Sequence, residues 1–432
     1  MRNNIVHVGA DELTYEIREI VDIAKKIEKF GVEITWENIG DPVAKGEKIP
    51  LWIKEIVAEL AMDDSSYAYC PTKGLLETRE FLAELTNKRG GAQITAEDII
   101  FFNGLGDAIA KIYGLLRKEA RVIGPSPAYS THSSAEGAHA GCPPITYYLD
   151  PENNWYPDLD DLRNKVKYNP SIAGILIINP DNPTGAVYPK KVLDEIVDIA
   201  NEYDLFIISD EIYCNLVYNG KKTALLPEVI DDVCGISLKG ISKEIPWPGA
   251  RCGWMEVYNV DKDPIFKKYI ESICRAKMVE VCSTTLPQKA IPRILSHKEY
   301  KKYLKERNAF YEKASNIAYN KLKDIEGIIV NRTNGAFYMS VVFREEYLNE
   351  NQKLHVENEK LRAFVENLVK NVPYDKRFVY YLLASTGICV VPLTSFCSDL
   401  KGFRITLLEK NENKFNWIYE TVSEKIKEYL NV

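Results

Sequence analysis

The stretch Gly240-Ile-Ser-Lys-Glu-Ile-Pro-Trp-Pro-Gly-Ala-Arg-Cys-Gly253 lies between two short runs rich in apolar residues, 233–238 and 254–257. Such runs, bounded by turn residues, are typical of buried strands, so the stretch is predicted to connect two strands. It carries Lys243 and Arg251, with two prolines and a glycine between them. A lysine that stands alone in a loop is usually solvated and inert. Any chemistry for Lys243 therefore depends on the residues that accompany it.

The composition is that of an ordinary globular chain. Of 432 residues, 46% are hydrophobic and 27% are charged, which is enough for one large core and a smaller second unit. The net charge of -7 is spread without long blocks, so no nucleic-acid partner is expected. No apolar signal core or membrane-spanning run is present, and the nine cysteines form no zinc pattern. We expect a cytoplasmic enzyme without a metal site.

Short apolar runs alternate with helical patterns along the middle of the chain. A continuous apolar run such as 175–178 is typical of a parallel strand that is covered on both faces. The other predicted strands of this part are 99–102, 120–123 and 205–208, and the predicted helices are 108–116 and a segment that starts at Pro189.

Polar or glycine-rich segments follow three of these strands, at 103–107, 179–185 and 210–213. Open α/β sheets bind ligands outside the carboxyl ends of their strands, so these segments are candidates for one site. The turn at 103–107 would leave backbone N–H groups free at a helix N-terminus, which suits a phosphate. By itself this turn is a weak signal, because many α/β turns contain glycine.

The stretch around Lys243 resembles the lysine segment of the class I/II aminotransferases, the fold-type-I enzymes that use pyridoxal phosphate. In that family a Ser-Lys pair is followed, eight residues after the lysine, by an arginine in a Pro-Gly-x-Arg-x-Gly turn, as in this chain. The resemblance implies that Lys243 forms a Schiff base with the cofactor and that Arg251 binds its phosphate. Only a primary amine forms an imine, and a guanidinium matches phosphate oxygens. The chain departs from many members at Gly240, where they carry a hydroxyl.

Two further segments resemble the same family. Asn-Pro-Asp-Asn-Pro-Thr-Gly at 179–185 and Asp-Glu-Ile-Tyr at 210–213 match its signatures in identity and spacing. The resemblance implies that Asn182 and Tyr213 bind the phenolic oxygen of the cofactor and that Asp210 faces its pyridine nitrogen. A carboxylate there keeps the ring protonated, so that the ring can accept electrons from the substrate.

The family also implies contacts on the other sides of the cofactor. The turn at Leu105, Gly106 and Asp107 would bind the phosphate, mainly through backbone donors because Gly106 replaces the usual hydroxyl. Tyr129 would lie over the pyridine ring. His132 matches a position behind the cofactor's aspartate in some members, although a satisfied core histidine is an equal alternative.

Three residues complete the implied site. Tyr69, in a segment that matches the family pattern, would reach the phosphate of the other subunit, which implies a homodimer with shared active sites. A buried loop aromatic is the alternative for Tyr69. Gly40 would lie close to the substrate, with a turn glycine as the plainer alternative. Arg404 would bind the α-carboxylate of the substrate, and Asn182 would contact the substrate as well as the cofactor.

The resemblance extends from about Gly40 to Leu407 and implies a fold. We expect a doubly wound, mostly parallel sheet domain that binds the cofactor and a smaller α+β domain made from both chain ends. The predicted ranges are 46–300 for the large domain and 1–45 with 301–432 for the small one. The small domain would include an amphipathic helix at 13–30 and a long charged helical stretch at 344–370, which is either solvated or a cover.

The implied function is transfer of an amino group between an L-amino acid and a 2-oxo acid. One alternative is a carbon–sulfur β-lyase, because the motifs indicate which cofactor is bound more specifically than which reaction is catalysed. Another is a ligand-sensing module that kept the fold, which the intact Lys243 disfavours. Dicarboxylate-specific members use a second arginine, and the matching position is Val279, with Arg275 and Lys277 nearby. An aliphatic residue there predicts a neutral amino acid, and not aspartate, as the better donor.

Overall fold

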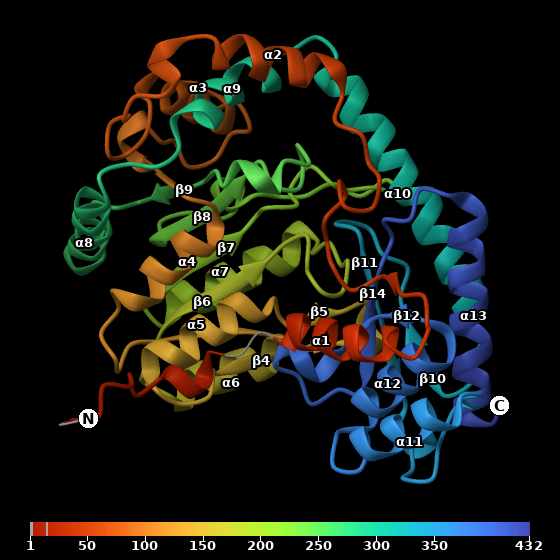
Figure 1. Ribbon diagram of the computed structural model, residues 1–432. Coiled ribbons are helices and arrows are strands. Elements are labelled where there is room, and N and C mark those ends of the chain that lie inside the picture. Colours follow the sequence, from red (N-terminus) through yellow and green to blue (C-terminus); the bar gives the residue numbers. More distant parts are fainter. Residues whose placement is uncertain (1–2, 14–15) are drawn as a thin grey trace.

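The computed structural model describes residues 3–13 and 16–432 and contains an eight-stranded, mostly parallel sheet (Figure 1). Only β9 and the short edge strand β5 run against the other strands. In spatial order the strands are β2 (Ile99–Phe102), β9 (Gly253–Tyr258), β8 (Gly235–Gly240), β7 (Phe206–Asp210), β6 (Ile172–Ile178), β3 (Arg121–Ser126), β4 (Thr146–Asp150) and β5 (Tyr156–Pro157). The predicted α/β fold is confirmed.

Helices cover both faces of this sheet. Successive residues of β2 fall alternately in two separate apolar cores, which shows that both sheet faces are buried. One core includes residues of α2 (Leu51–Ala61), α3 (Leu76–Asn87), α6 (Leu159–Tyr168), α7 (Lys190–Glu202) and α9 (Thr285–Leu295). The other is covered by α4 (Leu105–Gly114), α5 (Ser130–Ala140) and α8 (Pro264–Glu280).

A second unit lies beside the large sheet. Its four-stranded antiparallel sheet has the order β10 (Ile328–Val330), β11 (Tyr338–Phe343), β14 (Gly402–Thr406) and β13 (Val391–Pro392). Its helices are α1 (Glu16–Glu28), α10 (Tyr300–Leu322), α11 (Glu359–Leu368), α12 (Tyr374–Thr386) and α13 (Glu412–Leu430). A two-stranded parallel pair, β1 (Thr35–Trp36) with β12 (Ile388–Cys389), joins the N-terminal segment to it.

The apolar core of this second unit combines both chain ends. Ile20, Ala24 and Ile27 of α1 pack in one cluster with residues from α10 onward. We propose on this basis that the small domain is built from both termini. The helix α10 is continuous across the junction, since Tyr303 packs on the large core while Ala318 lies in the small one. The boundaries at residues 46 and 300 stay a prediction.

The prediction of a long helical stretch at 344–370 is wrong. It contains a short 3-10 turn (Glu345–Tyr347), an extended segment and then the ten-residue helix α11. In the extended segment Gln352, Leu354 and Val356 are buried alternately, which is the period of a strand and not of a helix. The side chain of Asn358 accepts the N–H groups of the first turn and so starts α11 there.

The N-terminal helix was expected at 13–30 and is observed as α1 at Glu16–Glu28. Residues 14 and 15 of the expected range lie outside the described residues. Within residues 3–13 and 16–432, no helix is long and apolar enough to cross a membrane.

Candidate active site

A cavity of about 590 Å³ opens where the carboxyl ends of the parallel strands meet the small domain. We call it the lysine cavity. All the predicted site residues except Tyr69 and Asp107 line it, namely Gly40, Leu105, Gly106, Tyr129, Asn182, Asp210, Tyr213, Lys243, Arg251 and Arg404. These residues come from distant parts of the sequence, so the fold itself brings the predicted chemistry together.

Lys243 lies in the loop between β8 and β9, as predicted. The two strands pair antiparallel up to Gly240 and Gly253, so the residues between them project from the sheet end. The Nζ of Lys243 donates a hydrogen bond of 2.8 Å to the carbonyl oxygen of Gly40. A Cβ atom at Gly40 would lie 1.8 Å from the hydroxyl oxygen of Tyr338, so only glycine permits this close approach.

The backbone of the lysine loop is held by Arg307, which the sequence did not reveal. This buried arginine of α10 donates from Nη1 to the carbonyl oxygens of Lys243 (2.9 Å) and Glu244 (2.7 Å). Its Nε donates to Glu47 at 2.6 Å. Burial pushes the pKa of Glu47 up, but the charges of Arg307 and Lys410 outweigh burial and leave that pKa below its ordinary value. The ion pair thus ties the lysine loop to the segment after Gly40.

The glycine-rich turn and Arg251 form a cradle for an anion. Gly104 has φ 85°, a conformation that favours glycine, and α4 begins directly after it. The first turn of α4, at Leu105 and Gly106, faces the lysine cavity with N–H groups that lack helical partners. A Cβ atom at Gly104 would lie 2.5 Å from the Nη2 atom of Arg251. The guanidinium therefore lies against the turn, beside the helix N-terminus.

Asp107 is not among the residues that line the lysine cavity, and its contact with the cofactor stays a prediction. Its carboxylate accepts the backbone N–H of Asn103 at 3.0 Å and pairs with Lys111. Its own backbone N–H donates to Gly104 at 3.1 Å, inside the turn. Asp107 stabilises the glycine-rich turn, whereas Leu105 and Gly106, the first two residues of α4, face the cavity.

A buried hydrogen-bonded chain stands behind the predicted pyridine site. The Oδ2 atom of Asp210 lies 3.0 Å from Nε2 of His132, and its Oδ1 accepts the N–H of Ile212 at 3.1 Å. The Nδ1 atom of His132 lies 3.4 Å from the hydroxyl of Tyr113. His132 is therefore a core histidine with a partner at each ring nitrogen, and one of these partners is Asp210. The two alternatives given for His132 are thus compatible.

Two phenols that line the cavity are in contact. The hydroxyl of Tyr213 donates to that of Tyr338 at 3.2 Å. Burial and then the neighbouring Tyr338 phenol raise the pKa of Tyr213 well above its ordinary value. Tyr213 thus stays protonated at neutral pH, and its hydroxyl can turn its one proton from Tyr338 to a ligand oxygen.

Arg404 is fixed in a buried position that suits a carboxylate. Its Nη1 donates to Oδ1 of Asn182 at 3.1 Å, and its Nη2 donates to the carbonyl of Asn38. The guanidinium lies 4.3 Å from the ring centre of Tyr338 and 4.8 Å from that of Phe396. Asn38, which the sequence did not single out, has a fully buried amide whose two polar atoms lack partners among the described residues. The site therefore holds polar groups that a ligand could satisfy.

Tyr69 lies on the surface and not in the lysine cavity of its own chain. Its side chain is 85% exposed, so the alternative of a buried loop aromatic is wrong.

Among the described residues no group of His, Cys, Asp and Glu is placed to hold a metal ion.

The fold and cavity together define an α/β protein in which a lysine, a glycine-rich helix start with an arginine beside it, a buried carboxylate and a buried arginine line one cavity. The model of the aminotransferase class I and II family matches residues 38–415. The chain is 74% identical to an uncharacterized aminotransferase of Methanocaldococcus jannaschii over 430 residues, 100% of both chains. It is 30% identical to glutamate-pyruvate aminotransferase AlaA of Escherichia coli, over 91% of this chain and 97% of that one. The chain therefore belongs to the class I and II aminotransferases.

A solved structure gives the same result. Alanine aminotransferase from Pyrococcus furiosus matches with a TM-score of 0.82 at 29% identity, covering 98% of each chain. As a member of this pyridoxal-phosphate-dependent family, the protein is an enzyme that transfers amino groups between amino acids and 2-oxo acids. These findings favour the aminotransferase over the carbon–sulfur lyase and the ligand sensor.

Proposed function

We propose that the lysine cavity binds pyridoxal phosphate and that Lys243 is its covalent attachment point. The observation that carries this proposal is the convergence of Lys243, Asp210, Arg251 and Arg404 on one cavity. When bound, the cofactor supplies a sink for the electron pair of the breaking bond at the substrate Cα.

The residues present fit such a group on each side. The first turn of α4 and Arg251 bind the phosphate, because backbone N–H groups and a guanidinium are matched donors. Asp210, oriented by His132, would pair with the ring nitrogen, and Asn182 and Tyr213 would donate to the phenolic oxygen. The remaining predicted contact, Tyr129, lines the same cavity and would cover the ring face.

The reaction follows from what these side chains can do. Arg404 would bind the α-carboxylate and so hold the substrate Cα near Lys243. The free amine of Lys243 would then take and return the proton at the substrate Cα. The hydrogen bond from Lys243 to the carbonyl of Gly40 keeps the free amine at the cavity wall during this step.

We also propose a homodimer in which Tyr69 binds the phosphate in the partner's lysine cavity. Large apolar side chains on the surface near this position support a protein interface. Met62, Tyr67, Tyr69, Met278 and Val279 are all exposed by 64% or more in the single chain. A cytoplasmic location is our further proposal, which the nine free cysteines support because thiols stay reduced there.

Shared sites predict complementation between two inactive variants. Mixing Lys243→Ala chains with Tyr69→Ala chains should restore roughly a quarter of wild-type activity, because half of randomly mixed dimers are heterodimers with one intact site. The measurement is turnover after the chains are unfolded and refolded together. The matched control mixes Lys243→Ala with Asp210→Asn, whose residues lie in the same chain's cavity, and should stay inactive. Equal activity in both mixtures, or none in the first, would contradict shared sites.

We propose a neutral amino acid as the preferred donor. Val279 is 88% exposed near the end of α8, where a partner subunit would cover it. The two nearby cations are engaged, since Arg275 pairs with Glu271 at 3.2 Å and buried Lys277 pairs with Glu280 at 2.9 Å. Relatives named alanine aminotransferase support this proposal, and a relative named glutamate-pyruvate aminotransferase makes glutamate the acidic amino acid to compare.

Alanine should therefore exceed aspartate in kcat/KM by about tenfold or more, because an unpaired distal carboxylate in a partly dry site is costly. The measurement compares alanine, methionine, phenylalanine, aspartate and glutamate against one 2-oxo acid. Val279→Arg should raise the aspartate value, and Arg275→Met serves as the control that should leave the order unchanged. A clear lead for aspartate in the wild type would overturn the proposal.

A further inference from the structure

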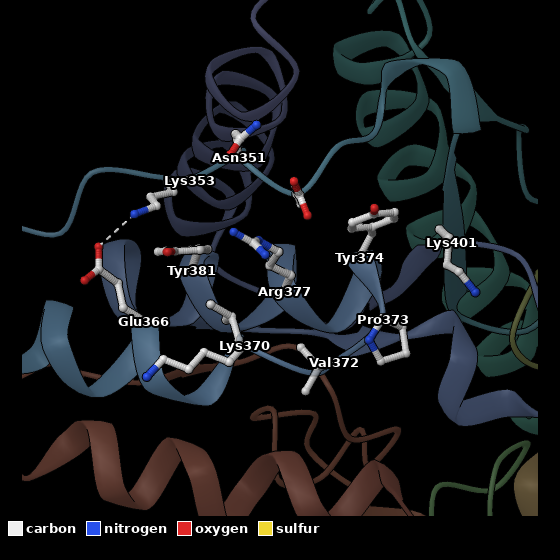
Figure 2. Close-up of a pocket in the computed structure, with 12 residues that line it drawn as sticks. Asn351, Lys353, Glu366, Lys370, Val372, Pro373, Tyr374, Arg377, Tyr381 and Lys401 are labelled. Carbon is white, nitrogen blue, oxygen red and sulfur yellow. Dashed lines mark hydrogen bonds and ion pairs between the residues drawn. The ribbon is translucent and has the colours of Figure 1, made fainter.

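A second cavity, of about 650 Å³, lies in the small domain and shares no lining residue with the lysine cavity. It is bounded by the loop at 350–353, the end of α11, the first turns of α12 and Lys401 (Figure 2). We call it the α12 cavity. Nothing in the transamination chemistry uses these residues.

One face of α12 points three side chains at this cavity. Tyr374, Arg377 and Tyr381 follow at spacings of three and four, which places them on the same helix face. Figure 2 shows Arg377 between the two rings, with its guanidinium toward the open space. Its Nε donates to the carbonyl of Gln352 at 3.3 Å, and buried Gln352 is in turn fixed by a 2.6 Å bond to the carbonyl of Tyr347. The guanidinium is therefore anchored at one edge, and its remaining N–H groups can donate to a ligand.

Tyr381 contributes a buried hydroxyl without a partner. The residue is 1% exposed, and its hydroxyl makes no hydrogen bond within the described part of the chain. Burial raises the pKa of the Tyr381 phenol, and the positive charges of Lys353 and Arg377 act against that rise. Glu366 adds to the rise, so the hydroxyl remains protonated and can donate at neutral pH. An acceptor placed in the cavity would satisfy it, since a buried unpaired hydroxyl is unfavourable.

The electrostatics of the α12 cavity favour an anion. Its positive side chains are Lys353, Lys370, Arg377 and Lys401, and its negative ones are Glu350 and Glu366. The 3.1 Å pair of Lys353 with Glu366 leaves an excess of positive charge.

The N-terminus of α12 adds to this field, because Pro373 precedes it without a side-chain cap. Asp375 in the first turn does not line the cavity, and its carboxylate accepts the backbone N–H groups of Thr394 and Lys376, both at 2.9 Å.

We propose that the α12 cavity is a binding site for a small molecule that carries a carboxylate or phosphate group. Arg377 and the hydroxyl of Tyr381 are its principal donors. This proposal is independent of the reaction in the lysine cavity.

The test titrates the full-length protein by calorimetry. The protein is saturated with pyridoxal phosphate, dialysed free of excess cofactor and held at constant ionic strength. One arm uses inorganic phosphate and the other uses succinate, so the tighter ligand identifies the source. Binding should saturate, and Arg377→Met should weaken it by about tenfold or more, as expected for loss of a charge-assisted bond. Tyr381→Phe should weaken it by roughly two- to tenfold without lowering Tm, because the hydroxyl has no protein partner to lose.

Arg362→Met on α11 is the matched control. It removes the same charge from an arginine that does not line the cavity, so binding should stay within about twofold. Absence of saturable binding in both arms would overturn the proposal. Equal loss in Arg377→Met and Arg362→Met, or binding that survives Arg377→Met unchanged, would overturn it as well, because the anion would then bind elsewhere.

Discussion

Replacing Lys243 by alanine should lower kcat by roughly four orders of magnitude or more, while the protein stays folded and still binds cofactor non-covalently. The amine is the proposed attachment point and the proposed proton carrier, so its loss removes two functions at once. Steady-state turnover measures the first effect. Reduction with borohydride followed by peptide mapping should place the pyridoxyl label on Lys243 in the wild type and on no lysine in the variant.

A suitable control for this experiment is Lys190→Ala. Lys190 is an exposed lysine of α7 that pairs with Asp194 at 2.6 Å, and its loss should leave turnover near that of the wild type. An active Lys243→Ala variant, or a wild-type label found on another lysine, would contradict the assignment.

Asp210→Asn should reduce kcat by roughly a thousandfold. The amide keeps the shape of the carboxylate next to His132 and Ile212 but removes the charge that would hold the pyridine nitrogen protonated. Measurements are kcat and the absorbance of bound cofactor as a function of pH. Asp107→Asn is the matched comparison, because that carboxylate lies outside the lysine cavity and should cost less than about tenfold. Loss of less than about tenfold in Asp210→Asn would mean that the aspartate is misassigned.

The large domain could be predicted because its determinants are local. Buried parallel strands appear as continuous apolar runs. β6 and β7 coincide with two such runs, and polar residues of the site follow at their carboxyl ends. The segments that carry Lys243, Asn182 and Asp210 are short, so the spacing of the residues within each segment can be read directly from the sequence. The cavity confirms that these segments converge.

The missed parts depend on contacts between distant residues. Arg307 looks like any charged residue of α10, and only the packing of that helix brings it to the carbonyl of Lys243. The approach of Tyr338 to Gly40 has the same origin. At 344–370 the abundance of charged residues suggested a helix, whereas the alternate burial of Gln352, Leu354 and Val356 shows a strand-like segment that packs on the small-domain core.

The central claim is that the cavity around Lys243 transfers an amino group to its own cofactor. The most direct test mixes the cofactor-loaded protein with L-alanine in the absence of any 2-oxo acid and follows the cofactor absorbance and the products. The cofactor band should convert once, with one pyruvate released per site and no ammonia. An unchanged band with every amino acid tried would contradict it, as would continued release of pyruvate, ammonia and sulfide when L-cysteine replaces L-alanine.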